Sequence, residues 1–215
     1  YPTIDPFSVK NKPLDKETIK KYLNKFGIPT DKPIIAQISR FDKWKDPEGV
    51  IKVFELVKRE VDCRLVLCGN LATDDPEGQV IYEQVSQKTR NMKDVILILE
   101  ENNILVNALQ STASVIIQKS LREGFGLTVT EALWKSRPVV ASNVGGIPLQ
   151  IIDGKTGFLL EPNDITGFAR KIITILKEPE LAQQLGENGQ AYVKENFLIT
   201  RSLLDYLEIL EEVFA

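Results

Sequence analysis

Six short apolar runs, each followed by a segment of helical or turn-forming residues, constrain the fold of this 215-residue chain more than any other feature. The runs are continuous rather than alternating, and continuous apolar runs are typical of strands that are covered on both faces, as in parallel sheets. Strand and helix alternate along the chain, which predicts βαβ units and a doubly wound α/β sheet. The strands are expected at 34–39, 64–68, 95–99, 114–118, 138–142 and 156–160.

Apolar residues three or four positions apart, together with start signals such as Pro47, predict the helices between these strands. The expected ranges are 47–60, 77–91, 104–111, 127–135 and 164–177. After the last strand only helices are expected, at 179–184, 189–195 and 200–214.

The chain divides into three predicted parts. Residues 1–32 are rich in proline and are predicted to form a linker that leads into the domain at 33–198. Residues 199–215 form a separate C-terminal helix. The only methionine is Met92, so we expect the chain to be a piece of a longer protein or a processed form.

Composition excludes several kinds of chemistry. The net charge is −3 with both signs mixed, so neither nucleic acid nor a membrane surface is an expected partner. No apolar run reaches the roughly 18 residues of a membrane span. The chain has no histidine, which removes the commonest general base and the commonest transition-metal ligand. Cys63 and Cys68 lie too far apart on one strand for a disulfide, so a reducing cytoplasm fits.

Ligands of doubly wound sheets bind at the carboxyl ends of the strands, so the loops after residues 39, 69, 100, 118 and 142 are the candidate site. Arg40 and Lys45 follow the first strand, and a forked donor with a point charge suits a diphosphate. The alternative is a surface loop in which these cations pair with Asp42 or Asp46.

A glycine-rich turn joins the fourth strand to the next helix. Gly124 and Gly126 allow close approach of a ligand, and the backbone N–H groups of Phe125, Gly126 and Leu127 can bind phosphate or sugar oxygens. The binding segment is expected to extend to Thr128.

Two carboxylates flank this turn. Glu123 precedes it, and Glu131 lies eight positions further on, where a helical side chain leaning toward the N-terminus can face the same crevice. Carboxylates beside glycines suit a ligand rich in hydroxyls, which indicates a nucleotide-sugar site. Alternatively, Glu131 only complements the helix dipole.

Three other patterns are weaker. The third glycine of a dinucleotide fingerprint would fall at Val129, so nicotinamide binding is disfavoured. A strand follows residues 154–156, which argues against a P-loop. The loop at 143–146 is either a plain turn or a second backbone contact, and Asp74 and Asp75 indicate a helix-start turn rather than a metal site.

Taken in order, these blocks resemble the retaining nucleotide-sugar glycosyltransferases of the GT-B fold, fourth sequence family. The resemblance covers nearly the whole chain, and 39–47, 74–78 and 118–134 resemble the trehalose synthase and trehalose phosphorylase subgroup. The matching blocks are Arg40 with Lys45, Glu-Gly-Phe-Gly-Leu at 123–127 with Glu131, Gly-Gly at 145–146, and Asp-Gly-Lys-Thr-Gly-Phe-Leu at 153–159.

The resemblance implies roles for individual residues. Arg40 and Lys45 would hold the diphosphate and stabilise the leaving group, and Glu123 would bind the hydroxyls of the donor glucose. Glu131 would bind the ribose, and the loops that begin at Gly69 and after Glu100 would line the base. The donor would be UDP-, ADP- or GDP-glucose, with no metal and no other cofactor.

The resemblance also implies a missing partner. Enzymes of this family have a second, N-terminal domain that binds the sugar acceptor, and the helix at 199–215 would cross to it. That helix is otherwise exposed or contacts a second copy in a homodimer. Three functions are open: glucose transfer that forms trehalose, a trehalose phosphorylase that uses phosphate, and a non-catalytic nucleotide-binding module. The fragment alone is expected to be inactive.

Overall fold

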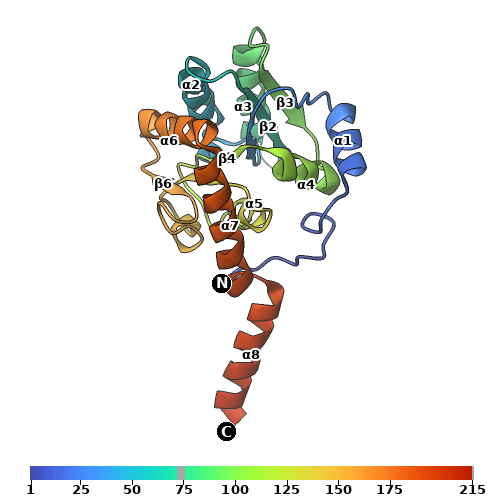
Figure 1. The fold of residues 1–215 in the computed structure, drawn as a ribbon, viewed down its shortest axis with the longest axis vertical. Coiled ribbons are helices and arrows are strands. Elements are labelled where there is room, and N and C mark those ends of the chain that lie inside the picture. Colours follow the sequence, from blue (N-terminus) through green and yellow to red (C-terminus); the bar gives the residue numbers. More distant parts are fainter. Residues whose placement is uncertain (72–75, 215) are drawn as a thin grey trace.

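The computed structural model describes residues 1–71 and 76–214, and a six-stranded sheet lies at its centre (Figure 1). All strands are parallel, in the order β3-β2-β1-β4-β5-β6, which confirms the predicted doubly wound sheet. The order reverses between β1 and β4, where successive helices cross to opposite faces. The strands are β1 (Ile34–Ile38), β2 (Arg64–Gly69), β3 (Val95–Leu99), β4 (Val115–Gln118), β5 (Val139–Ser142) and β6 (Phe158–Leu160).

Both faces of the sheet are buried, as the continuous apolar runs predict. Ile34 and Ala36 of β1 belong to one core and Ile35 to the other. The first core packs under α1 (Lys16–Lys25), α4 (Asn103–Thr112) and α5 (Leu127–Trp134), and the second under α2 (Pro47–Lys58), α3 (Pro76–Thr89) and α6 (Ile165–Lys177).

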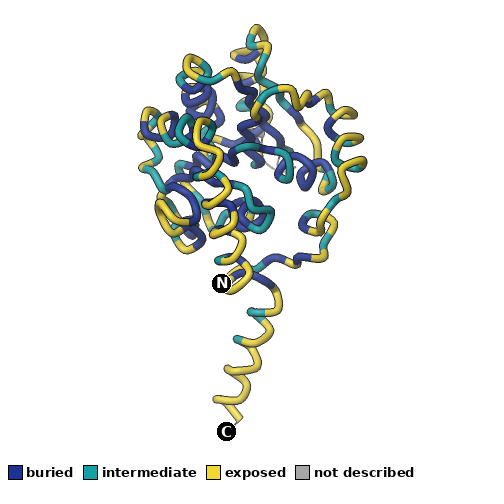
Figure 2. Tube along the Cα trace, in the orientation of Figure 1, coloured by how far each residue is buried: buried dark blue, intermediate teal, exposed yellow. Residues whose placement is uncertain are grey.

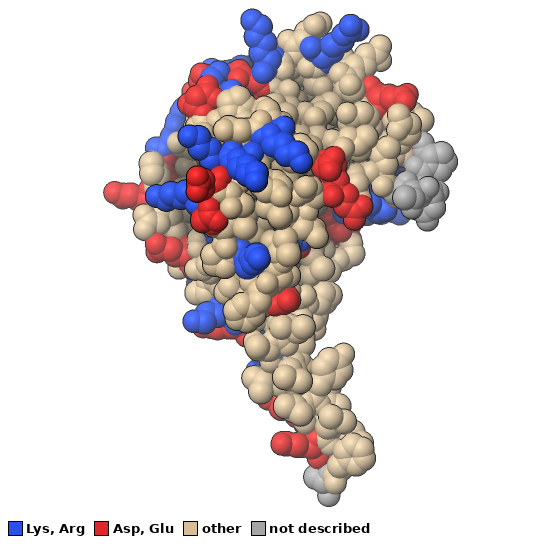
Figure 3. Space-filling view, turned by 90° about the vertical axis from the view of Figure 1, so that its right-hand side faces the viewer, with Lys and Arg blue, Asp and Glu red and all other residues tan. Residues whose placement is uncertain are grey.

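Helix α1 lies within the segment that the sequence analysis describes only as a linker. Asp15 caps it by accepting a hydrogen bond from the Thr18 N–H at 2.7 Å, and Leu23 is buried against the core beside α4. Pro2, Pro6 and Pro13 precede the helix and Pro29 follows it, so no proline interrupts it. The lysines of α1 are exposed on a face where both charge signs are interspersed (Figure 3).

A single helix, α7 (Pro179–Asn196), replaces the two helices predicted at 179–184 and 189–195. Gly186 and Gly189 lie at the predicted break, and these glycines serve close packing. A Cβ at Gly186 would lie 2.2 Å from the Ser136 carbonyl oxygen. The missing side chain therefore allows α7 to pass the end of α5 without a gap.

The last helix, α8 (Ile199–Phe214), extends away from the body of the molecule, and none of its described residues is buried (Figures 1 and 2). Its apolar side chains include Leu203, Leu207 and Leu210, each about half exposed or more. Within residues 1–71 and 76–214, no helix combines the length and the apolarity that a membrane crossing requires.

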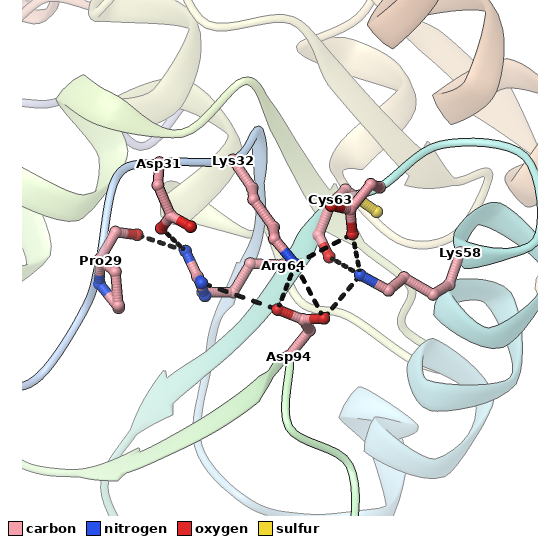
Figure 4. A network of polar contacts seen from close by, with 8 residues as sticks. Pro29, Asp31, Lys32, Lys58, Cys63, Arg64 and Asp94 are labelled. Atoms are coloured by element: carbon pink, nitrogen blue, oxygen red, sulfur yellow. Dashed lines mark hydrogen bonds and ion pairs between the residues drawn. The ribbon is translucent and has the colours of Figure 1, made fainter.

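A cluster of charged residues joins the amino ends of β1, β2 and β3 (Figure 4). Asp94 accepts hydrogen bonds from Lys58 at 2.6 Å and from Lys32 at 3.1 Å, and these contacts hold the pKa of its carboxyl below the usual range. Arg64 donates to Asp31 at 2.8 Å. The cluster satisfies its own charges and lies at the edge of the sheet opposite the candidate loops.

The two cysteines offer a test of this packing. Cys63 and Cys68 join different cores, and burial raises their pKa values to about 11 and about 12. Because the thiolate is the reactive form, we expect almost no reaction with a disulfide reagent at pH 8 in the folded protein and two reactive thiols per chain in denaturant. A native thiol that reacts as fast as free cysteine would contradict this packing.

Candidate functional site

A buried glutamine organises the carboxyl edge of the sheet at the reversal between β1 and β4. The Gln37 amide donates to the Lys45 carbonyl oxygen at 2.9 Å and accepts from the Lys119 N–H at 3.2 Å. These two partners belong to the loops that follow β1 and β4. One side chain therefore fixes both loops relative to each other.

Aspartates shape the loop after β1. Asp42 accepts from the N–H groups of Trp44 at 2.9 Å and Lys45 at 3.1 Å, which starts a short 3-10 turn. Asp46 has a left-handed φ of 43°, caps α2 through the Gly49 N–H at 3.0 Å, and forms an ion pair with the buried ammonium of Lys119. The loop thus presents Lys45 toward the loop after β4.

The side chains of Lys45 and Glu123 meet between these loops in an ion pair of 2.5 Å, and both are largely buried. The same Glu123 oxygen accepts from the Gln118 amide and the Ser120 hydroxyl, each at 3.2 Å. Its other oxygen accepts from the Gly124 N–H at 3.1 Å. Several donors therefore hold this carboxylate in one orientation.

A hollow of about 390 Å³, the Glu123 pocket, opens beside this ion pair. Arg40 extends over it with 54% of its side chain exposed and only a 3.4 Å contact to Asp42. Gly126, with a φ of +85°, is the N-cap of helix α5, and no side chain of the described residues caps the helix. The site residues that line the pocket are Arg40, Lys45, Glu123, Phe125, Gly126, Leu127 and Thr128.

The loop at 143–146 lies behind the glycine-rich turn. The Gly146 N–H donates to the Gly124 carbonyl oxygen at 2.7 Å, and a Cβ at Gly145 would lie 1.9 Å from the Glu123 carbonyl oxygen. Neither glycine lines the Glu123 pocket. From the sequence this loop is either a plain turn or a second backbone contact with the ligand. In the structure its backbone contacts the glycine-rich turn and supports it.

A second hollow of about 210 Å³, the Gly69 pocket, adjoins the first and shares Ser39, Arg40 and Thr128 with it. Gly69 lies at the end of β2, where a Cβ would come within 1.7 Å of the Ser39 carbonyl oxygen. The other polar residues around this pocket are Lys10, Asn70, Glu100, Glu101, Asn102 and Asn103.

Glu131 does not line either pocket, although the sequence analysis expects it to face the same crevice as Glu123. Its side chain is 5% exposed and forms a 3.0 Å ion pair with Lys10, while Gln110 donates to its other oxygen at 3.3 Å. The contact with Lys10 therefore stands where a contact with the crevice was expected. Gly124 forms the turn itself and is absent from both pocket linings.

Sequence reasoning missed several residues that build the site. Gln37 and Gln118 interrupt apolar strands, and a polar residue in a buried strand is a signal that could have found them. Lys119 has no such signal, because its partner Asp46 lies 73 positions earlier. Lys10 has none either, since its place depends on the folding of the N-terminal segment.

Within the part of the chain that the structure describes, no cluster of three or more acidic, cysteine or histidine side chains is arranged to hold a metal ion. Asp74 and Asp75, which the sequence analysis assigns to a helix-start turn, lie outside the described residues.

The strand order defines a Rossmann-like α/β domain, and the hollow lies at the carboxyl edge, where folds of this class bind their ligands. Residues 18–192 match the family model described as Glycosyl transferases group 1. The chain belongs to this glycosyltransferase family, whose members have the GT-B fold.

Among curated proteins, the chain is 44% identical to a trehalose synthase of Thermococcus litoralis over 97% of its length and 51% of the relative. It is 45% identical to that of Rubrobacter xylanophilus over 100% of its length and 52% of the relative. A trehalose phosphorylase of Grifola frondosa is 34% identical over 82% of the chain and 26% of the relative. The chain therefore spans about half the length of the trehalose synthases that it matches.

Solved structures agree on the fold. A glycosyltransferase from Rickettsia africae superposes with a TM-score of 0.87 at 24% identity, over 99% of this chain and 56% of that one. Anabaena Alr3699/HepE, solved in complex with UDP-glucose, superposes with a TM-score of 0.80 at 20% identity, over 96% of this chain and 56% of that one.

Two glycines of the site make a matched test. In Gly69→Ala the new methyl collides with backbone at Ser39, so we expect a loss of about 1–3 kcal/mol or more in the free energy of unfolding. Gly124 has no neighbouring atom within 4 Å of a built Cβ, so Gly124→Ala should stay within about 0.5 kcal/mol. Urea denaturation measures both, and equal effects would contradict the packing at the end of β2.

Proposed function

We propose that this domain binds the donor of a retaining glycosyltransferase, a nucleoside diphosphate glucose, and that the longer protein transfers the glucose to a second glucose to form trehalose. The names of the relatives at 44% and 45% identity support this choice of product. The UDP-glucose complex of a protein with the same fold supports the class of donor.

The observation that carries the proposal is the meeting of Arg40, Lys45 and Glu123 in one pocket at the reversal of the sheet. Two cations beside the uncapped start of α5 provide an electropositive place for a diphosphate. A carboxylate fixed next to them accepts hydrogen bonds from sugar hydroxyls. In this orientation the diphosphate of the ligand lies at the start of α5 and its sugar lies beside Glu123.

In this proposal Arg40 and Lys45 stabilise the negative charge that develops on the leaving diphosphate. In a site shielded from water, one such cation can lower the barrier by several kcal/mol. The backbone N–H groups of Leu127 and Thr128 bind the same phosphates. Lys45 exchanges part of its contact with Glu123 for the ligand, so the free protein keeps both charges satisfied until the donor arrives.

We assign the base to the Gly69 pocket. The end of β2 and the loop after β3 form this hollow, and it adjoins the Glu123 pocket through Arg40 and Thr128. Asn70 and Asn102 offer amide donors and acceptors for the edge of a base. Which of uracil, adenine or guanine fits is the first question for a binding experiment.

The acceptor belongs, on this proposal, to a further domain of the longer protein, onto which α8 packs its exposed apolar face. The alternative partner of that face is a second copy of this chain in a homodimer. Sedimentation of this chain at several concentrations distinguishes the homodimer from a monomer. We place the protein in the cytoplasm, since its two cysteines are free and buried.

Calorimetric titration with UDP, ADP and GDP tests the donor site. We expect one of them to bind, and Arg40→Ala to weaken it by about 10- to 100-fold, because a hydrogen bond to a charged group contributes about 1.5–3 kcal/mol. Arg201→Ala is the control, since Arg201 has a similarly exposed side chain but lies on α8. An unchanged affinity in Arg40→Ala would end the proposed role of this residue.

The same titration separates the alternative functions. Binding of inorganic phosphate without any nucleoside diphosphate would favour the phosphorylase. In the longer protein, near-complete activity of both Arg40→Ala and Glu123→Ala would favour a non-catalytic nucleotide-binding module.

Turnover gives a further prediction. This chain carries the proposed donor site but no proposed acceptor site, so we expect nucleotide binding without trehalose formation from nucleoside diphosphate glucose and glucose. Product analysis by chromatography measures this, with a full-length relative as the positive control. Trehalose formed by the 215-residue chain at a comparable rate would show that the acceptor binds here.

A further inference from the structure

A hollow of about 630 Å³, the Arg137 pocket, lies at the edge of the sheet opposite the Glu123 pocket. It is lined by Pro33, Ser114 and Pro138, which directly precede β1, β4 and β5. These strands are four or five residues long and rise about 3.3 Å per residue, so at least about 13 Å separates the two pockets. The Arg137 pocket is therefore a separate place on the molecule.

The ends of two helices form an apolar wall of this pocket. Ile175 and Leu176 belong to the last turn of α6, and Ala182 lies near the start of α7. The volume of the hollow is within the range of about 300–1,000 Å³ that is usual for small-molecule sites. The wall can cover the apolar body of a ligand, so the polar groups of the pocket decide which ligand fits.

Arg137 is a cation without an acidic partner among the described residues. Its side chain is partly buried, and only its Nε–H donates to a described residue, to the Lys135 carbonyl oxygen at 3.2 Å. Burial lowers the pKa of the guanidinium, but an arginine stays charged at neutral pH. A charge that is partly withdrawn from water is costly unless it is paired. The N–H donors at the end of this side chain are therefore available to an anion.

The turn that carries Arg137 has a fixed backbone. The Ser136 N–H donates to the Leu133 carbonyl oxygen at 2.9 Å and the Arg137 N–H to that of Ala132 at 3.1 Å, which are the two bonds of a Schellman motif. This motif usually has glycine at its left-handed position, but here Ser136 has a φ of +55°, which is unfavourable for a residue with a Cβ. The unfavourable conformation keeps a hydroxyl in the lining of the pocket, beside the guanidinium in sequence.

Glu187 is the acidic residue in the lining of this pocket. It is exposed on α7, accepts a hydrogen bond from the Gln183 amide at 2.7 Å and forms no ion pair with Arg137. Salt and water screen an exposed charge more than a partly buried one. The charge of Arg137 consequently dominates, and the pocket favours an anion.

We propose that the Arg137 pocket binds a small organic anion, a phosphate monoester or a carboxylate with an apolar body. The forked donors of the guanidinium hold the oxyanion, and the Ser114 and Ser136 hydroxyls donate to it. The apolar part of the ligand lies against α6 and α7. Because this site does not involve the nucleotide pocket, it stands or fails independently of the proposed function.

Calorimetric titration with four probes tests the class of ligand. Naphthyl phosphate and naphthoate are the two organic anions, naphthol is their uncharged counterpart, and acetate is an anion without an apolar body. We expect at least one organic anion to bind with a dissociation constant of about 1 mM or below, and naphthol and acetate to bind about tenfold more weakly or less. The tighter of the two anions shows whether the site prefers phosphate or carboxylate.

Variants of the chain locate the bound probe. Arg137→Met should weaken the organic anion by about tenfold or more, and Ser136→Gly by about threefold. Arg170→Met is the matched control, because Arg170 is an exposed arginine of α6 that does not line the pocket, and it should keep the parent affinity. Thermal unfolding checks the fold of each variant. Arg137→Met removes an unpaired charge and glycine suits the φ of Ser136, so neither should lower the melting temperature.

Three results would overturn the proposal. Neither organic anion binds, or naphthol or acetate binds as tightly as they do. Alternatively, Arg40→Ala removes the binding and Arg137→Met does not, which would locate the probe in the Glu123 pocket. If Arg137→Met does not fold, Arg137→Lys replaces it, because lysine keeps the charge without the forked donors. An unchanged affinity in the variant that folds would also end the proposed role of Arg137.

Discussion

A buried amide at the centre of the sheet is the contact on which the rest of the site depends. Neighbouring strands β1 and β4 feed helices on opposite faces, so their loops diverge and leave polar backbone groups with no regular partner. Gln37 satisfies one group on each loop, through the Lys45 carbonyl oxygen and the Lys119 N–H. Two ion pairs, Lys119 with Asp46 and Lys45 with Glu123, then cross the same gap. Buried pairs add little net stability, but losing one partner costs about 3–5 kcal/mol, so they select this loop arrangement over others.

The two edges of the sheet carry the same types of charged residue, but these residues are paired differently. At the amino edge, Lys32, Lys58 and Arg64 each have an acidic partner within the cluster around Asp94, and the charges are satisfied within the protein. At the carboxyl edge, Arg40 reaches its nearest acid only at 3.4 Å and is half exposed. Under the proposed function, Arg40 has an incomplete set of partners because it binds the ligand, whereas the cations around Asp94 at the amino edge stabilise the ends of the strands. Sequence alone cannot distinguish them, because both edges show basic and acidic residues near strand ends.

The sheet was predictable because its strands are largely apolar, and the central strands β1, β4 and β5 are buried along their whole length. In the edge strand β3 most residues are only partly buried, but the predicted and observed ranges coincide at Val95–Leu99. The loops that carry Arg40, Lys45 and Glu123 follow from the strands, since the carboxyl ends of parallel strands share one edge. Helix α1 was not foreseen because the proline-rich composition of its segment indicates a linker and its apolar stripe is short, and α7 was divided at glycines that serve close packing. In each case a tertiary contact, absent from any local window, decided the outcome.

Glu131 shows why the site could be located but not completed from its motif. The exposure of its side chain depends on Lys10, which lies more than a hundred positions earlier. The motif around the glycine-rich turn places a carboxylate at a fixed position on α5. The N-terminal segment determines which residue that carboxylate contacts. Because Asn107 and Trp134 anchor that segment through its backbone carbonyls, the anchoring does not depend on the side chains at Val9 or Lys12. The fold can therefore hold the segment in place whichever side chain stands at position 10 beside the Gly69 pocket.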